Sequence, residues 1–396
     1  MIRANPVMRI THIITRLIIG GAQENTVSTL LGLRQIPGLE LNLISGPSEG
    51  PEGTLEPDVL KVPGLLTKIP ELVRPVHPAK DLVALVKLEK VLRRQQPHIV
   101  QTHSGKAGIL GRIAAHRAGV PVIIHHIHGP SFGPFQGTLA NQAFTLAERF
   151  AGRYTHHFFC SAAAMARIYL KAGIGRPEFY TRIFSGFPLE PYLQSANLAD
   201  LRMKWGLHPS HFVIGKVARL VPLKGHTDLL EAFACLAPRV PRARLLLVGD
   251  GVLRGQLEQH ARKLGIRDRI VFAGLVQPSQ VPVLVGIMDC LAHLSFREAL
   301  SRALPQALAA GKPVVSYDFD GADEVCQNGD TGFLISSGDF HGVASALEQL
   351  ASNPSLCQRL GKTGRDFVAA NFRVDKMVQD QLAVYKRLAL ERGLVS

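Results

Sequence analysis

The chain has 396 residues, 46% of them hydrophobic, and a formal net charge of +14. This length suggests two or more domains, and the hydrophobic content excludes a disordered chain. The charge fits either a basic soluble enzyme or a protein that meets an anionic substrate or lipid surface, whereas nucleic acid is disfavoured because no basic run interleaves with aromatic residues.

In the first half, strand-like apolar runs alternate with stretches of helical spacing. Strands are predicted at 9–16, 41–46, 98–103, 121–129 and 155–162, and helices at 23–33, 81–95 and 107–118. This alternation is typical of βαβ units in an open parallel sheet.

Pro188, Pro191 and the polar stretch to Asp200 interrupt this alternation, so we expect an interdomain linker at 186–200. Strands are then predicted at 212–220, 244–251, 269–274, 289–295, 313–318 and 331–335, and helices at 227–237, 253–264 and 280–285. The fold class is therefore α/β, with Rossmann-like domains at 1–190 and 191–375, and a last helix within 376–396 that is long enough to pack across both. Ligands of such sheets bind beyond the carboxyl ends of the strands, so the natural site is a cleft that the two domains face.

The five cysteines are far apart, odd in number and without metal-ligand spacing, which indicates reduced thiols of a cytoplasmic protein. Residues 2–6 lack the apolar core of a secretory signal. No run of 18 apolar residues exists, so no membrane span is expected. We therefore expect a cytoplasmic protein, either free or peripheral on the inner face of the membrane.

The stretch from Leu294 to Ile335 is the most informative part of the chain. Pro305 belongs in the first turn of a helix, which should therefore begin between 300 and 305. The free backbone N–H groups at such a start favour a phosphate, whereas the carboxylate of Glu298 just before it suits sugar hydroxyls. Together these groups predict a site for a sugar nucleotide.

Two cations follow the strand at 212–220. Arg219 and Lys224, with Gly225 allowing a close backbone approach, suit a diphosphate leaving group, although two solvated loop cations are the alternative. Gly20 and Gly21 end the first strand, where glycine permits a positive φ and close approach to a ligand. A plain turn between strand and helix is the alternative there.

Histidines crowd the end of the strand at 121–129. Alternation places His126 and His128 on one face and His125 on the other. Neighbouring positions on one strand cannot converge on one ion without help from elsewhere, so no metal is predicted. His128 is the candidate donor to a substrate hydroxyl, with a structural histidine as the alternative.

Other polar residues also follow strands. His103, Ser104 and Lys106 are candidates for the acceptor side or for a phosphate, unless they are ordinary loop residues. Four acidic residues after the strand at 313–318 could hold Mg²⁺. The favoured interpretation is that Glu324 braces the loop while the aspartates are largely solvated; the group consists of Asp318, Asp320, Asp323 and Glu324.

Several segments together resemble a known family. In chain order they are IGKVARLVPLKGHTDLLEAF, LLLVGDGVLRGQLE, IVFAGLV, SFREALSRALPQALAAGKPVVSYDFDGADEV and NGDTGFLI. This order resembles the donor domain of a retaining glycosyltransferase of family 4 with the GT-B fold. The first half agrees less specifically, through RITHIITRLIIGGAQ and VQTHSGKAGILGRIAAHRAGVPVIIHHIHG.

The resemblance implies roles for particular residues. Arg219 and Lys224 would bind the diphosphate and stabilise it as it leaves. Glu298 matches the first acid of the family's E-x7-E motif and would contact the transferred sugar. Gln306 stands where the second acid contacts the ribose, and it can still donate and accept hydrogen bonds there.

The resemblance also implies a glycine loop at Gly20 and Gly21 and a contact between His128 and the donor sugar. It places three backbone amides at the phosphates, those of Ala299, Leu300 and Ser301. No metal would be needed, and transfer would occur on the front face with retention of anomeric configuration, the departing diphosphate taking the acceptor's proton.

We therefore expect transfer of a sugar from a nucleotide-diphosphate donor, a UDP-sugar by family frequency, to a lipid-linked or polysaccharide acceptor in envelope or exopolysaccharide assembly. Residues 1–190 carry 21 Lys and Arg against 12 Asp and Glu. A basic stretch within them fits an anionic membrane surface, unless it is an ordinary solvated helix face; it comprises Lys87, Lys90, Arg93 and Arg94.

Two alternatives stay open. A sugar-nucleotide epimerase of similar fold would need acid and base carboxylates in the first half, where no convincing pair is seen. A catalytically inactive nucleotide-binding scaffold is supported by Gln306, whereas the joint presence of Arg219, Lys224 and Glu298 argues against it. Binding of UDP and GDP separates these hypotheses.

Overall fold

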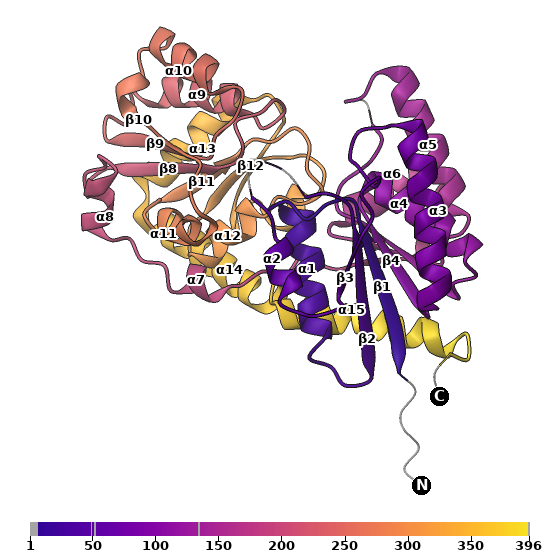
Figure 1. Ribbon diagram of the computed structural model, residues 1–396. Coiled ribbons are helices and arrows are strands. Elements are labelled where there is room, and N and C mark those ends of the chain that lie inside the picture. Colours follow the sequence, from indigo (N-terminus) through magenta and orange to yellow (C-terminus); the bar gives the residue numbers. More distant parts are fainter. Residues whose placement is uncertain (1–6, 49, 51–52, 134, 395–396) are drawn as a thin grey trace. The chain divides into compact units, whose positions relative to one another are not determined.

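The computed structural model describes residues 7–48, 50, 53–133 and 135–394 (Figure 1). Residues 2–6, where a secretory signal was considered, lie outside the described residues. The chain divides into two compact units, Met1–Phe187 together with Val374–Ser396, and Pro188–Arg373. Among the described residues, no helix is both long and apolar enough to cross a membrane.

The first unit is built on a parallel sheet with the strand order β3-β2-β1-β4-β5-β6-β7. Its strands are β1 (Met8–Ile14), β2 (Leu39–Ser45), β3 (Leu66–Lys68), β4 (Ile99–His103), β5 (Val122–Ile127), β6 (His157–Cys160) and β7 (Tyr180–Arg182). Its helices are α1 (Gly21–Leu33), α2 (Glu56–Leu60), α3 (Pro78–Gln95), α4 (Gly105–Arg117), α5 (Thr138–Gly152), α6 (Ala163–Lys171) and α15 (Val374–Leu390), with the 3₁₀ turn η1 (Pro177–Phe179).

Both faces of this sheet are covered, which explains the nearly continuous apolar runs of its central strands. On β5, Val122 and Ile124 pack in the cluster that contains Met377 and Tyr385 of α15. Ile123 between them points to the opposite cluster, which contains residues of α3 and α4. The last helix of the chain thus belongs to the core of the first unit.

The second unit contains a parallel sheet with the order β10-β9-β8-β11-β12-β13. Its strands are β8 (Phe212–Val217), β9 (Ala243–Val248), β10 (Ile270–Gly274), β11 (Cys290–His293), β12 (Val314–Tyr317) and β13 (Gly332–Ile335). Its helices are α7 (Glu190–Leu193), α8 (Ala199–Lys204), α9 (His226–Leu236), α10 (Arg254–Lys263), α11 (Val281–Gly286), α12 (Ala303–Ala309), α13 (Phe340–Ser352) and α14 (Pro354–Asn371), and its 3₁₀ turns are η2 (Arg267–Arg269), η3 (Pro278–Gln280) and η4 (Ala322–Glu324).

The predicted strands and helices are confirmed, and two further strands were missed for a physical reason. Strands β3 and β7 are three residues long and lie at the two edges of the first sheet, so they carry too little apolar pattern to be recognised. The stretch expected as a linker, 186–200, contains the one-turn helix α7. Pro191 stands in the first turn of α7, where proline needs no amide partner.

Strand order reverses once in each sheet, between β1 and β4 in the first and between β8 and β11 in the second. At such a switch point the connections of neighbouring strands leave on opposite faces, and a crevice opens at the carboxyl ends. Most of the candidate residues follow these four strands or their neighbours.

Candidate functional site

In the second unit, the candidate residues lie on the two loops at the β8/β11 switch point. Arg219 and Lys224 belong to the loop that joins β8 to α9, and Glu298 belongs to the loop between β11 and α12. Because β8 and β11 are direct neighbours in the sheet, both loops begin at the same edge.

Close backbone contacts hold these two loops together. Gly225 has a φ of 63°, and a Cβ there would lie 1.7 Å from the carbonyl oxygen of Leu294. Only glycine allows this approach, because a side chain would clash with fixed backbone. The carbonyl of Leu223 accepts hydrogen bonds from the Phe296 amide at 2.9 Å and from Ser295 Oγ at 3.1 Å. Lys224, between Leu223 and Gly225, is therefore fixed beside the second loop.

The Lys224 ammonium forms a salt bridge with the Glu298 carboxylate. His293, the last residue of β11, places its Nε2 3.5 Å from Glu298 Oε1. Burial alone would raise the pKa of Glu298, but the neighbouring His293 and the charge of Lys224 outweigh it and lower the pKa to about 2. Glu298 is therefore a carboxylate at neutral pH, which can only accept hydrogen bonds, as from hydroxyl groups.

Asp320 corrects one expectation from the sequence. The aspartates after β12 were expected to be largely solvated, and Asp318 and Asp323 are exposed. Asp320 instead is half-buried and accepts a 2.9 Å hydrogen bond from the amide of Glu298. Burial raises the pKa of Asp320 to about 6. Asp320 is therefore part of the support that orients the Glu298 loop.

A small pocket adjoins the Glu298 carboxylate. It is lined by Glu298 and by the three residues whose amides were assigned to phosphates, Ala299, Leu300 and Ser301. Helix α12 begins at Ala303, inside the predicted window, and Ser301 Oγ accepts a 3.3 Å hydrogen bond from the Ala303 amide. Gln306 is half-buried on this seven-residue helix.

Arg219 lies exposed at the start of the β8–α9 loop. Its carbonyl oxygen is 2.9 Å from Nε2 of His226, a buried residue that opens α9 and so ties the two ends of the loop together. Burial lowers the pKa of His226 to about 3, so the ring is neutral and can donate one N–H to that carbonyl. Arg219 and Lys224 thus share one loop, and Lys224 contacts Glu298.

Lys216 was not singled out from the sequence, and it lies near the carboxyl end of β8, just before the β8–α9 loop. Its side chain is fully buried, and its Nζ has no hydrogen-bond partner among the described residues. Burial and the nearby charge of Lys224 lower its pKa to about 7. The available signal was a single lysine inside the apolar run FVIGKV.

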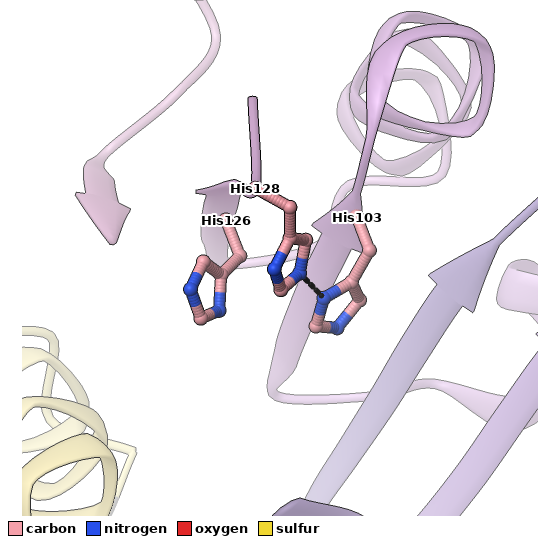
Figure 2. Close-up of side chains that lie close together, drawn as sticks. All are labelled: His103, His126 and His128. Carbon is pink, nitrogen blue, oxygen red and sulfur yellow. Dashed lines mark hydrogen bonds between the residues drawn. The ribbon is translucent and has the colours of Figure 1, made fainter. Parts of the chain in front are cut away.

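In the first unit, histidines gather at the β1/β4 switch point and on the neighbouring strand β5 (Figure 2). His103 Nδ1 lies 2.9 Å from His128 Nε2, and His103 Nε2 lies 2.9 Å from His12 Nδ1. The rings of His126 and His128 stack with centroids 4.0 Å apart. Burial lowers the pKa of each of these rings, to about 3 for His12 and His128, so the cluster is neutral.

The predicted split of the β5 histidines between two faces is confirmed. His125 points away from the cluster, with its Nδ1 2.9 Å from Thr102 Oγ1 and its ring against Gly108. The sequence did not reveal that His103 pairs in register with His126, which brings a third imidazole to the face of His126 and His128. Strand register across a parallel sheet cannot be read from one strand.

The remaining candidates of the first unit lie at helix starts. Ser104 precedes α4 with a φ of 64°, and Lys106 in its first turn is held by the Asp81 carboxylate and the Pro75 carbonyl. The positive φ expected at Gly20 is wrong, because Gly20 has an extended φ of 172° rather than a left-handed one. Gly21 begins α1 in helical conformation.

Family models match both units of this chain. The model described as "Glycosyl transferases group 1" matches residues 199–367, and the model described as "Glycosyl transferase 4-like domain" matches residues 20–181. Each match covers most of one of the two sheets described above.

Individual proteins agree with these matches. A UDP-Gal:alpha-D-GlcNAc-diphosphoundecaprenol alpha-1,3-galactosyltransferase of Escherichia coli is 29% identical over 78% of this chain and 80% of its own length. The putative glycosyltransferase EpsD of Bacillus subtilis is 29% identical over 77% of this chain and 81% of its own. The crystal structure of Anabaena Alr3699/HepE in complex with UDP superposes with a TM-score of 0.81 at 22% identity, over 96% of this chain and all of that one, and shares the fold. The chain therefore belongs to the group 1, family 4-like glycosyltransferases and has the GT-B fold of two Rossmann-like domains.

Proposed function

We propose that this glycosyltransferase transfers a hexosyl or N-acetylhexosaminyl group from a UDP-sugar, with retention of configuration, to a lipid-linked or saccharide acceptor of envelope or exopolysaccharide assembly. The observation that carries the proposal is the Lys224–Glu298 pair at the β8/β11 switch point, next to a pocket lined by the segment 298–301. A cation and a carboxylate held side by side match the two chemical halves of a sugar diphosphate.

The proposed roles follow from the charges. Lys224 and Arg219 neutralise the diphosphate as it leaves, which lowers the barrier mainly through positioning and charge stabilisation. Glu298 orients Lys224 with one oxygen and accepts a sugar hydroxyl with the other, since its lowered pKa keeps it ionised. The amides after Glu298 donate to phosphate oxygens. The diphosphate itself takes the acceptor's proton, so no metal is required.

In the first unit, we assign a contact with the donor sugar to His128, which is half-buried just beyond β5. Gly20 and Gly21 remain the proposed glycine loop, and their place at the start of α1 lets the backbone approach a ligand without a side chain between. Ser104 and His103 remain candidates for the acceptor side. Lys106 also remains a candidate, and Asp81 holds its ammonium as Glu298 holds that of Lys224.

The choice of donor and acceptor is supported by what the similar proteins are called. The Escherichia coli relative is named for UDP-Gal and for a diphosphoundecaprenol acceptor, and the Anabaena protein was crystallised with UDP. A UDP-hexose and a lipid diphosphate are therefore the first substrates to test. The matched models and relatives described above are glycosyltransferases, so the epimerase alternative is not proposed.

An anionic membrane surface as a partner is supported by helix α3. Three apolar residues on it are exposed, Leu82 by 62%, Val83 by 43% and Val86 by 55%. Exposed cations continue along the same helix, with Lys90 and Arg94 toward its end. Apolar side chains flanked by cations suit an interfacial helix. Binding to vesicles with phosphatidylglycerol that weakens at high salt would support this partner, and binding that salt leaves unchanged would contradict it.

One residue favours a second candidate function, an inactive nucleotide-binding scaffold. Gln306 lacks the charge of the family's second acid and would weaken ribose binding by roughly 1 kcal/mol. The scaffold predicts that UDP binds without any sugar transfer or slow hydrolysis of the donor.

The test is a panel of sugar nucleotides, assayed for transfer to a lipid diphosphate and for slow hydrolysis. Lys224→Met and Arg219→Met should each lower kcat by roughly 10²–10³-fold, the usual effect of removing one group that stabilises developing charge. Lys263→Met changes an exposed lysine on α10 and is the matched control. Normal turnover in both loop variants would refute the assigned roles.

A further inference from the structure

The histidine cluster of the first unit brings three imidazoles to one point. His103, His126 and His128 each offer a ring nitrogen, and the three nitrogens all lie within 4.8 Å of one another. Figure 2 shows the His128 ring between the other two, with His103 reaching in from β4. His103 and His126 are fully buried, and His128 is half-buried, so a small ion can reach the cluster past His128.

His126 points to a ligand because both of its ring nitrogens are buried and find no hydrogen-bond partner among the residues that the structure describes. A buried polar atom left unpaired costs roughly 1–3 kcal/mol, and native proteins rarely keep one without a reason. A neutral imidazole carries one lone pair in the ring plane, which is the group that binds a transition metal.

The nitrogen spacing suits a first-row metal ion once the rings turn out of their present stacking, in which the planes of His103 and His128 differ by 18° and those of His126 and His128 by 19°. A tetrahedral ion with bonds of about 2.0–2.1 Å to nitrogen separates its ligand atoms by about 3.4 Å. His103 Nδ1 and His128 Nε2 lie 2.9 Å apart and must separate slightly, and a ring nitrogen of His126 lies within 4.8 Å of a ring nitrogen of each.

His12 supplies the supporting hydrogen bond that metal-binding histidines need. Its Nδ1 lies 2.9 Å from His103 Nε2. If His103 carries its proton on Nε2 and donates it to His12, its Nδ1 lone pair faces His128 and is free for the ion. Such an outer partner fixes the ring and its tautomer.

We infer that His103, His126 and His128 form a binding site for a transition-metal ion, with Zn²⁺ as the expected occupant and a fourth coordination position open. Three imidazoles favour Zn²⁺, Co²⁺, Ni²⁺ or Cu²⁺ over the oxygen-seeking Mg²⁺ and Ca²⁺. The ion is not a requirement of transfer. If His128 contacts the donor sugar, a consequence that rests on the proposed function, the bound ion competes with the donor and inhibits.

The experiment measures binding directly on the full chain after chelator treatment. Zn²⁺ is titrated by calorimetry, and Co²⁺ by visible absorption, whose intensity distinguishes a tetrahedral site from hydrated ion. The wild type should bind one equivalent of either ion, and Mg²⁺ should give no heat. His126→Phe keeps an aromatic ring but removes a ligand, and His128→Gln changes the half-buried histidine. Each should weaken binding at least about 100-fold, more than loss of an outer partner does.

His208 and His211 provide the matched control. Their ring centroids lie 5.9 Å apart in the second unit, so His208→Ala with His211→Ala removes a pair of neighbouring histidines outside the cluster. This control should leave the affinity unchanged. Circular dichroism spectra that match the wild type show that the variants fold. A wild type without a Co²⁺ band, or undiminished binding by folded His126→Phe and His128→Gln, would overturn the inference whether or not the protein transfers sugar.

Discussion

Replacing Lys216 by methionine should stabilise the second unit in a pH-dependent way. Lys216 lies fully buried on β8, with its Nζ unpartnered among the described residues. Its pKa falls from the usual 10.5 to about 7 in the folded protein, chiefly because burial disfavours the ammonium. At about 1.4 kcal/mol for each pKa unit, holding this charge in the folded state costs up to roughly 5 kcal/mol.

The direction with pH follows from linkage. Below pH 7 the folded protein carries the buried ammonium and bears the full penalty, while the unfolded chain is protonated without one. As the pH rises from 7 toward 10.5, the folded lysine becomes neutral first and the penalty disappears. Methionine has a similar length and no charge. The stability gain of Lys216→Met should therefore be several kcal/mol near pH 6.5 and should shrink steadily toward pH 10.

Trp205 makes the measurement specific, because it is the sole tryptophan of the chain and belongs to the second unit. Its fluorescence during urea unfolding at pH 6.5, 8 and 9.5 gives the free energy of unfolding of that unit. Lys263→Met, an exposed lysine of the same unit, corrects for general loss of charge. A Lys216→Met variant that is less stable at pH 6.5, or whose gain does not change with pH, would refute the reasoning.

Two further predictions concern residues of the second unit near Lys224 and Glu298. Gly225→Ala should lower both stability and kcat, because its Cβ would meet the Leu294 carbonyl and push Lys224 away from Glu298. Gly265→Ala is the control, because Gly265 has a similar φ of 68° but open space around it. In urea unfolding followed by Trp205 fluorescence, Gly225→Ala should lose roughly 1–3 kcal/mol more unfolding free energy than Gly265→Ala. Equal losses in the two variants would contradict the close approach of Gly225 to Leu294. Gln306→Glu should tighten UDP binding about fivefold by calorimetry, the equivalent of roughly 1 kcal/mol at the ribose. Weaker UDP binding by Gln306→Glu would contradict the placement of residue 306 at the ribose.

Much of the fold follows from local pattern. Alternating apolar runs and helical spacing predicted the central strands of both sheets, because these strands are buried on both faces and read as continuous apolar segments. Pro305 fixed the start of α12 because proline fits only a first turn. The edge strands β3 and β7 were not predicted, because three residues are too few to show an alternating or continuous apolar pattern.

The sequence predicted those site residues that follow a strand on a single loop. It did not predict contacts that depend on how two strands align in the sheet. Lys224 and Glu298 were recognised from their positions after strands, and the structure joins them. His103 was seen as a separate candidate, because its pairing with His126 depends on how β4 and β5 align. The hydrogen bond from the Glu298 amide to Asp320 likewise joins residues 22 positions apart, across a helix and a strand.

The central claim is that Lys224 and its neighbours on the β8–α9 and β11–α12 loops bind the diphosphate of the donor. The most direct measurement compares the affinities of UDP and uridine for the wild type and for Lys224→Met by calorimetry. The account predicts that the variant binds UDP roughly 10–100-fold more weakly, the loss of one charged hydrogen bond, while uridine binding is unchanged. UDP affinity that survives the substitution, or an equal loss for uridine, would contradict it.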